Sequence, residues 1–274
     1  MKKIPISLEK HQKILYELLY ILDDFCKDNN IRYFLTYGTL LGAVRHQGII
    51  PWDDDVDVMM ERKEYERFQK LIIANPPDGY QAYSIKNTKG YLYPFIKFGK
   101  KDTLLIEPFP YVPKEGIGIN IDVFPIDGCP DEYVVAQKYT ENCMKTILRN
   151  LNNTSYKNFW SAKGKKAKLI ALFNKFDFLK KIRFQCLYNS LASKYDLNHS
   201  KFFSVSQWTW YGARDVHPIE DIKNSILLRF GERDLPVPIG YHDFLTKCYG
   251  DYMTPPPIDK RKSTHIHGDV YILL

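Results

Sequence analysis

The sequence predicts an α/β (α+β) protein in which a mixed sheet is flanked by helices, with a mainly helical C-terminal portion. Two observations carry this prediction. Strand-like and helix-like segments alternate through the first half of the 274 residues, as they do in α/β folds. The composition, with 45% hydrophobic and 26% charged residues, is that of an ordinary domain with a buried core.

The first element is a long helix within residues 7–30. Ser7 is its expected N-cap, because a serine hydroxyl accepts a hydrogen bond from a free N–H group of the first turn. Apolar residues recur at helical spacing along one stripe: Ile14, Leu18, Leu22 and Phe25. Residues 31–37, "IRYFLTY", then favour a strand.

A short helix and a second strand follow. The helix is expected over "LLGAVRHQG", with Thr39 as its cap and Gly48 past its end. Residues 55–60, "DVDVMM", alternate in polarity as a strand does. The order is therefore strand, helix, strand.

The rest of the chain contributes further strands and then helices. Residues 91–99 and 116–128 are two more strand candidates, and residues 132–196 are mostly helical in pattern. We expect residues 1–130 to form the core. Residues 131–274 are then a mainly helical region that packs with the core as one compact unit.

The net charge of +7 is concentrated in one segment. Residues 157–184 contain nine Lys or Arg against the single acid Asp177, which leaves the rest of the chain near −1. The apolar residues in this segment recur at steps of three and four, so a helix there would be basic and amphipathic. Such a helix lies either on an anionic membrane surface or on its own domain with its lysines in water. No nucleic-acid-reading motif accompanies the charge, so nucleic acid is not an expected partner.

The sequence also indicates the compartment. No stretch approaches the ~20 apolar residues that span a bilayer, and the start "MKKIPISLEKHQK" lacks the apolar segment of a secretory leader. The five cysteines are odd in number and never in CxxC spacing, which argues against a disulfide framework and against a zinc site. We therefore expect a cytoplasmic, reducing location.

The densest cluster of charge is "PWDDDVDVMM", residues 51–60, with Asp53, Asp54, Asp55 and Asp57 in five positions. Carboxylates this close repel one another and raise one another's pKa unless a cation lies between them. The cluster is either an acidic turn in water or a divalent metal site. On a strand, Asp55 and Asp57 point to one side, and Mg²⁺ takes such carboxylates together with waters and phosphate oxygens.

Two features elsewhere favour the metal site. Gly38 and Thr39 begin the short helix, where free N–H groups and the helix dipole attract phosphate. Asp122 lies on an apolar strand, where a buried acid is costly without a cation or hydrogen bonds. Asp122 is therefore the best candidate to complete a metal triad with Asp55 and Asp57.

These residues carry a family resemblance. The run "YFLTYGTLLGAVRHQGIIPWDDDVDVMM" resembles the signature of the LicD family, phosphocholine transferases of bacterial cell-surface glycans that are related to fukutin-type phosphotransferases. "GIGINIDVFPIDG" and "FGERDLPVPIGYHDFLTKCYGDYMTPPP" are similar to that family's second and C-terminal blocks, so the resemblance runs from about Ile31 to Pro257. It implies a nucleotidyltransferase-like fold with residues 1–130 as its catalytic core, Mg²⁺ and a cytidine-diphosphate donor.

The resemblance also implies roles for individual residues. Gly38 and Thr39 match the phosphate-contacting element, and Asp55 and Asp57 match the paired metal ligands. Asp122 matches the third acid, which is a metal ligand, the general base or both. One or two Mg²⁺ ions are expected, with Mn²⁺ as a substitute.

Four neighbouring residues have weaker assignments. Asp53 is either a further metal ligand or the cap of a turn, and Asp54 is expected to belong to the turn or to support the metal ligands. Arg45, at the exposed end of the short helix, is a candidate to neutralise charge on the leaving group. For His46, a helix-end role is favoured over phosphate binding.

The implied reaction transfers phosphocholine from CDP-choline to a sugar hydroxyl of a cell-surface glycan precursor, of teichoic acid or lipopolysaccharide type, and releases CMP. The expected partners are CDP-choline, a lipid-linked glycan and the anionic inner face of the cell membrane, contacted through residues 157–184. Choline is usually held by aromatic faces, and Trp208, Trp210 and Tyr211 form the densest aromatic cluster, although an alternating Trp pair also fits a strand core. The alternatives are the same fold transferring ribitol phosphate, glycerol phosphate or a nucleotide, and a non-catalytic membrane-surface scaffold.

Overall fold

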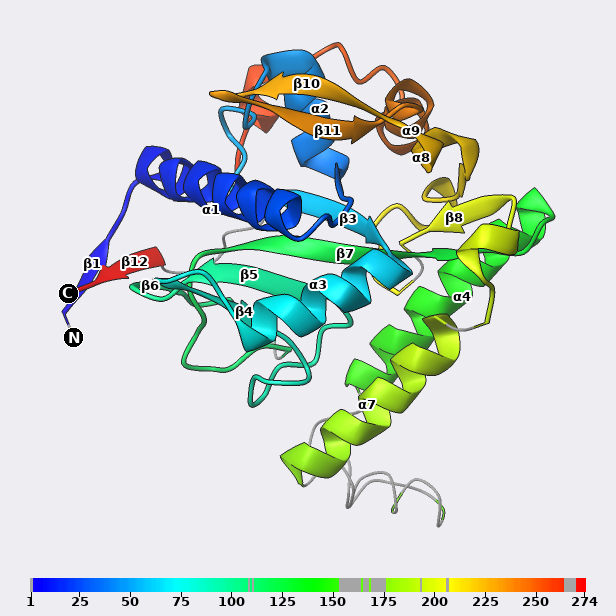
Figure 1. Cartoon of the computed structure of the whole chain (residues 1–274), viewed down its shortest axis with the longest axis horizontal. Coiled ribbons are helices and arrows are strands. Elements are labelled where there is room, and N and C mark those ends of the chain that lie inside the picture. Colours follow the sequence, from blue (N-terminus) through cyan, green and yellow to red (C-terminus); the bar gives the residue numbers. More distant parts are fainter. Residues whose placement is uncertain are drawn as a thin grey trace.

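The structure is a computed structural model that describes residues 2–107, 109, 111–152, 164, 168, 176–192, 194–205, 207–263 and 270–274. It is a mixed α/β fold, as the sequence predicts, with helices around a central sheet (Figure 1). One large hydrophobic core includes buried residues from Ile14 to Tyr252, so both halves of the chain contribute to it.

The central sheet has seven strands in the described part of the chain. Its main order is β2–β3–β7–β5–β4, with β8 beside β7 and β9 beside β8. The pair β3–β7 is parallel, and the other pairs are antiparallel. The strands are β2 (Phe34–Leu35), β3 (Asp57–Glu61), β4 (Tyr80–Tyr83), β5 (Ile96–Lys100), β7 (Asn120–Gly128), β8 (Phe202–Ser204) and β9 (His217–Pro218).

Two helices cover one face of this sheet, α1 (Leu8–Asp28) and α3 (Arg62–Ala74) (Figure 1). The ring of Phe25 on α1 meets the ring of Phe68 on α3 edge-on, with centroids 5.8 Å apart. The predicted apolar stripe of α1 is buried at Ile14, Leu18 and Leu22, and burying each such side chain contributes ~1.5–3 kcal/mol.

The predicted cap of α1 is confirmed, whereas the predicted cap of the next helix is wrong. Ser7 Oγ accepts a hydrogen bond from the Lys10 N–H at 3.3 Å. Helix α2 (Tyr37–His46) begins earlier than predicted and has Thr36, not Thr39, at its N-cap position. The reason is strand pairing: the Thr36 N–H donates to the Asp57 carbonyl at 3.2 Å, which ends the extended backbone at Thr36.

Smaller sheets complete the fold. Strands β1 (Lys3–Pro5), β12 (Val270–Leu273) and β6 (Thr103–Leu105) form a three-stranded antiparallel sheet, which brings the two ends of the described chain together (Figure 1). Strands β10 (Ser225–Phe230) and β11 (Arg233–Pro238) form a hairpin.

The helices of the second half are α4 (Tyr133–Asn152), α7 (Asp177–Ala192), α8 (Glu220–Lys223) and α9 (Tyr241–Tyr249). Short 3₁₀ turns lie at Leu197–His199, Gly212–Arg214 and Ile258–Lys260. The Tyr139 hydroxyl of α4 donates to the Leu191 carbonyl of α7 at 2.9 Å, so these two helices lie side by side. The division of the chain at residue 130 stays a prediction.

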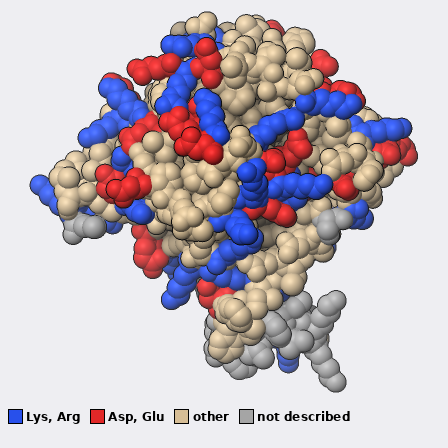
Figure 2. All heavy atoms as spheres, viewed as in Figure 1, with Lys and Arg blue, Asp and Glu red and all other residues tan. Residues whose placement is uncertain are grey.

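The hydropathy of the described helices agrees with the sequence analysis. Most of the basic segment 157–184 lies outside the described residues, and only its end, from residue 176 onward, is described continuously. Among the described helices, none is long and apolar enough to cross a bilayer. Figure 2 shows basic and acidic side chains interspersed over the face that it draws.

Candidate active site

A cavity of about 310 Å³ lies where α2, β3 and β7 meet the C-terminal region. Four aspartates and six aromatic rings are among the residues that line it. Its lining residues are Tyr37, Gly38, Leu41, Ile50, Asp53, Asp55, Asp57, Asp122, Phe124, Trp208, Trp210, Tyr211 and Tyr249.

The sheet register brings the predicted acids together. Asp57 begins β3 and lies beside Asp122 in the parallel pair β3–β7. Because side chains alternate along a strand, Asp122 and Phe124 share the face that lines the cavity, while Ile121 and Val123 face α1 and α3. Asp55 precedes β3 by two residues and lines the same cavity.

Crowding and burial disturb the protonation of these acids. Burial raises the pKa of Asp55 to about 7, and the charges of Asp54 and Asp122 add to the rise. Burial also raises the pKa of Asp57 well above its usual value, with further contributions from Asp55 and Asp122. Each group binds its proton more tightly than a free carboxylic acid does, which indicates a shortage of positive charge at this point.

Lys97 is a charged neighbour that the sequence analysis missed. It lies on β5 opposite Asp122, and its Nζ atom is 2.7 Å from Asp122 Oδ1 and 3.2 Å from Glu107 Oε1. Burial opposes the charge of Lys97, but Asp122 and Glu107 outweigh it and raise the lysine pKa above its usual value. A lysine between the apolar residues of "PFIKFG" was the available signal, because an ammonium group on a core strand needs a carboxylate partner.

The two remaining acids of the cluster differ in position. Asp53 lines the cavity, whereas Asp54 is buried and accepts a hydrogen bond from the Ser263 hydroxyl. Helix α1 holds their backbone: Gln12 Nε2 donates to the Asp53 carbonyl at 2.7 Å, and His11 Nε2 donates to the Asp54 carbonyl at 2.9 Å. The acidic turn is therefore fixed from behind by a helix that belongs to the core.

The start of α2 forms another wall. Gly38 lines the cavity, and a Cβ atom at this position would lie 3.0 Å from Asp53 Oδ2. Thr39 is buried beneath the surface, and its Oγ1 atom accepts a hydrogen bond from the Asp57 N–H at 2.8 Å. The structure thus places Gly38 at the cavity and uses Thr39 to tie α2 to the start of β3.

A group of aromatic rings, here called the aromatic wall, lines the same cavity as the aspartates. Tyr37 stacks on Tyr211 with ring centroids 5.1 Å apart, and the Tyr211 hydroxyl donates to the Tyr249 hydroxyl at 2.5 Å. Trp210 is 67% exposed, whereas Trp208 is 5% exposed. The two rings meet edge-on, with centroids 5.9 Å apart. Of the predicted rings, Trp210 and Tyr211 therefore offer accessible surface, and Trp208 supports them from the core.

The acids suit a hard divalent cation. Carboxylate oxygens of Asp53, Asp54 and Asp55 all lie within 4.8 Å of one another, and Asp57 and Asp122 face the same cavity. Oxygen donors of this kind favour Mg²⁺ or Mn²⁺ over softer metals. Such an ion would supply the positive charge that the raised pKa values of Asp55 and Asp57 indicate is lacking.

Comparison with known proteins assigns a family to part of the chain. Residues 30–145 match the family model described as "LicD/FKTN/FKRP, nucleotidyltransferase domain". Residues 30–145 are a LicD-family domain. The resemblance seen in the sequence is therefore confirmed, and the domain contains every aspartate of the cavity.

Two named relatives extend the comparison. Over the full length of both chains, the protein is 29% identical to the lipopolysaccharide cholinephosphotransferase LicD of Haemophilus influenzae. It is 28% identical to the human ribitol 5-phosphate transferase FKRP over 95 residues, which are 32% of this chain and 18% of that protein. A third relative, an uncharacterized protein of Rickettsia typhi, is 41% identical over 34% of this chain and 28% of its own length. The LicD-family domain at residues 30–145 supports a phosphotransferase activity.

The LicD domain also contains Arg45 and His46, but these residues do not line the cavity. Both lie in the last turn of α2, at the end opposite Gly38. Arg45 Nη1 donates to the Tyr252 carbonyl at 2.6 Å, and the ring of His46 meets Trp52 edge-on. In this position Arg45 joins α2 to the C-terminal segment. The part of the cavity formed by Trp208, Trp210, Tyr211 and Tyr249 lies outside the LicD domain but within the full-length alignment with the Haemophilus enzyme.

Proposed function

We propose that the protein transfers phosphocholine from CDP-choline to a sugar hydroxyl of a cell-surface glycan precursor, of teichoic acid or lipopolysaccharide type, and releases CMP. The observation that carries the proposal is one cavity that both aspartates and aromatic rings line. The carboxylates suit the metal that accompanies a diphosphate, and the rings suit a quaternary ammonium group. The full-length similarity to a cholinephosphotransferase supports the same reading.

The proposed reaction is an in-line displacement at phosphorus. The sugar oxygen forms a bond to the choline-bearing phosphorus, and the bond between that phosphorus and the bridging oxygen breaks, so that CMP leaves. The hydroxyl proton passes to a carboxylate of the cluster, for which Asp122 is our candidate. The product is a glycan that carries phosphocholine through a phosphodiester.

The chain's own groups position the reactants. Asp55, Asp57 and Asp122, with Asp53 beside them, would hold one or two Mg²⁺ ions or Mn²⁺ in their place. Bound there, such an ion would screen the diphosphate charge and increase the acidity of the attacking hydroxyl. The N-terminal N–H groups of α2 at Gly38 lie at the same cavity, where they suit a phosphate oxygen.

Release of CMP tests the reaction. The full chain is incubated with Mg²⁺ and a membrane-extracted glycolipid acceptor, separately with CDP-choline, CDP-ribitol, CDP-glycerol and CTP. Acceptor-dependent CMP from CDP-choline is expected, with a loss of at least about 100-fold in Asp57→Asn and wild-type rates in Asp78→Asn, which removes an exposed carboxylate outside the cavity. Full activity of Asp57→Asn would remove that residue from the site.

A second donor has specific support in the ribitol 5-phosphate transferase to which the LicD domain is similar. A substitution of Trp210 distinguishes CDP-choline from CDP-ribitol, because this ring is exposed and lines the cavity. If choline contacts this ring, Trp210→Ala raises the KM for CDP-choline by roughly fivefold to thirtyfold, as expected for the loss of a cation–π contact of ~1–2 kcal/mol. Reaction with CDP-ribitol in preference to CDP-choline would keep the phosphotransferase and replace the donor.

The proposed location is the cytoplasmic side of the cell membrane, with the protein bound peripherally. The described end of the basic segment exposes Phe176, Phe178 and Ile182, with exposed fractions of 52%, 71% and 40%. Exposed aromatic and aliphatic side chains within a lysine-rich segment suit insertion into an anionic bilayer surface. A lipid-linked acceptor would be presented at the same surface.

A further inference from the structure

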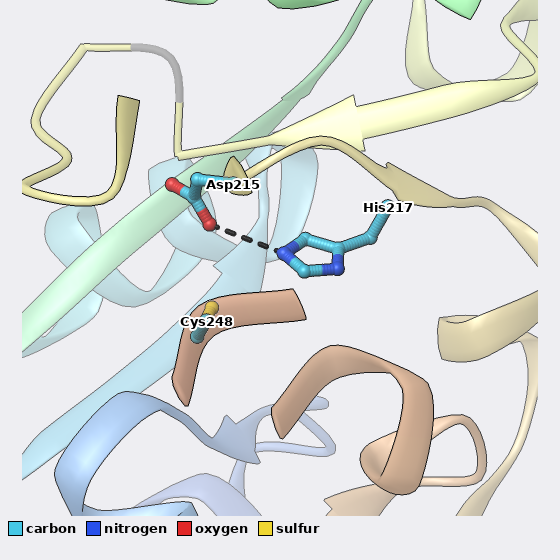
Figure 3. A group of neighbouring side chains, drawn as sticks. All are labelled: Asp215, His217 and Cys248. Carbon is cyan, nitrogen blue, oxygen red and sulfur yellow. Dashed lines mark hydrogen bonds and ion pairs between the residues drawn. The ribbon is translucent and has the colours of Figure 1, made fainter. Parts of the chain in front are cut away.

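A second group of metal-ligating side chains lies apart from the aspartates, in the C-terminal region. Asp215 follows the 3₁₀ turn Gly212–Arg214, His217 begins β9, and Cys248 belongs to α9. Figure 3 shows the three side chains pointing toward one another from these separate elements. All three are buried, with exposed fractions of 0% for Asp215, 0% for His217 and 2% for Cys248.

We propose that Asp215, His217 and Cys248 form a zinc site that ties β9 to α9 behind the aromatic wall of the cavity. A carboxylate oxygen, an imidazole nitrogen and a cysteine sulfur are the ligands that Zn²⁺ takes in proteins. One such atom from each residue lies within 4.8 Å of the other two. The fourth position of a tetrahedral ion is left for a small ligand such as water.

The distances suit zinc with small side-chain movements. Asp215 Oδ1 and His217 Nε2 are 3.3 Å apart. For bonds of about 2.0–2.1 Å to oxygen and nitrogen, the edge of a tetrahedron around zinc is about 3.3 Å. The sulfur of Cys248 lies within 4.8 Å of a ligand atom of each of the other two residues, and an inward movement of its side chain brings it to a bond of about 2.3 Å.

The surroundings hold two of the ligands in orientation. The Tyr37 hydroxyl donates to Asp215 Oδ2 at 2.8 Å, which leaves Oδ1 directed at His217. The ring of His217 stacks on Phe244 with centroids 4.0 Å apart. A hydrogen bond to a ligating carboxylate and a fixed imidazole ring are the usual supports around a protein-bound metal.

The balance of charge also favours a metal. Zn²⁺ with one carboxylate and one thiolate is neutral overall, which suits a buried position, and the Cys248 proton is released to solvent when the ion binds. The thiolate distinguishes this site from the all-oxygen aspartate cluster, because sulfur selects zinc over magnesium.

Metal analysis of the full chain tests the proposal. After purification, loading with Zn²⁺ and removal of loosely bound ions, the protein is expected to retain about one zinc per chain. Cys248→Ala is expected to lose it. Cys143→Ala, which removes another buried cysteine, and Asp55→Asn, which alters the aspartate cluster, are expected to keep it.

Cobalt substitution decides the outcome even where Cys248→Ala folds poorly. Wild-type protein loaded with Co²⁺ is expected to show a near-ultraviolet thiolate-to-cobalt absorption band and the visible bands of a tetrahedral ion. Chelation is expected to lower the Tm, and Zn²⁺ but not Mg²⁺ is expected to restore it. Wild-type protein that retains no zinc, or whose Co²⁺ form lacks the thiolate band, overturns the proposal.

Discussion

Lys97 shows how one residue stabilises an acidic site. Its ammonium group is paired with Asp122 and Glu107 on a sheet strand, and its side chain is 9% exposed. In Lys97→Met, Asp122 and Glu107 lose the cation that they share, and water has little access to replace it. We expect the free energy of unfolding to fall by about 3 kcal/mol, as for other buried ion pairs that lose one partner.

Denaturant titration at pH 7 measures this loss. Lys101→Met is the matched control, because Lys101 is exposed and its removal is expected to change stability by less than about 0.5 kcal/mol. Equal stabilities for Lys97→Met and Lys101→Met would mean that the buried pair contributes nothing.

Asp55 predicts an unusual dependence of stability on pH. Its pKa is about 7 in the folded protein against an ordinary value of 3.8, so the folded state binds the proton more tightly than the unfolded state does. The resulting stabilisation is complete below pH 4 and is lost as the pH rises through 7. Without divalent metal, the contribution of this group to the free energy of unfolding therefore falls between these limits.

Magnesium is expected to reverse that loss of stability, because the bound ion neutralises the Asp55 carboxylate as the proton does. We expect Mg²⁺ to raise the Tm at pH 8 and to have little effect at pH 5, and we expect Asp55→Asn to weaken the dependence on pH. Thermal unfolding at the two pH values, with and without Mg²⁺, measures this. An equal Mg²⁺ effect at both values would contradict the assignment of the metal to these carboxylates.

At the scale of the element, two glycines of α2 are expected to have different roles, Gly38 in activity and Gly42 in stability. A Cβ atom at Gly38 would lie 3.0 Å from the Asp53 carboxylate and would displace it, whereas a Cβ atom at Gly42 would lie 2.4 Å from the Gly48 carbonyl oxygen. We expect Gly38→Ala to lower kcat/KM at least about tenfold with little change in Tm, because alanine is the better helix former. Gly42→Ala is expected to lower the Tm, because a backbone oxygen cannot move aside cheaply.

Comparing the two variants by thermal unfolding and CMP release checks this division of roles. A Gly38→Ala protein with full activity would show that the cavity tolerates a methyl group at the helix start. A Gly42→Ala protein as stable as wild type would show that the Gly48 loop moves freely.

The elements also show what the sequence could and could not predict. Local signals sufficed for α1, with its apolar stripe and Ser7 cap, and for the acids at the start of β3. The start of α2 was not predicted correctly because Thr36 pairs with β3, a strand that follows the helix in the chain. Capping rules consider only residues near the helix end, so they do not include this contact. Lys97 was missed because its role depends on the register of β5 with β7.

The same limit explains the C-terminal region. Asp215, His217 and Cys248 are brought together by tertiary structure, and a search for CxxC spacing cannot find a site that takes one cysteine from a distant helix. Tyr37 and Tyr249 likewise join the aromatic wall from opposite ends of the chain. Sequence spacing predicted that Asp55, Asp57 and Asp122 gather in one place, and the fold was needed to show which rings line the same cavity.

At the scale of the whole molecule, membrane binding is the remaining prediction. Phe178 is 71% exposed on α7, within the basic segment 157–184. We expect the protein to sediment with vesicles that contain anionic lipid, less so at high salt, because lysine attraction to the surface is screened. Phe178→Ala is expected to lower the bound fraction, whereas Leu227→Ala, which removes a 64% exposed side chain on β10, is not. Equal binding to neutral and anionic vesicles would show that lysine attraction does not hold the protein at the surface. Equal losses in Phe178→Ala and Leu227→Ala would show that insertion is not specific to α7. Either result would contradict a basic amphipathic anchor.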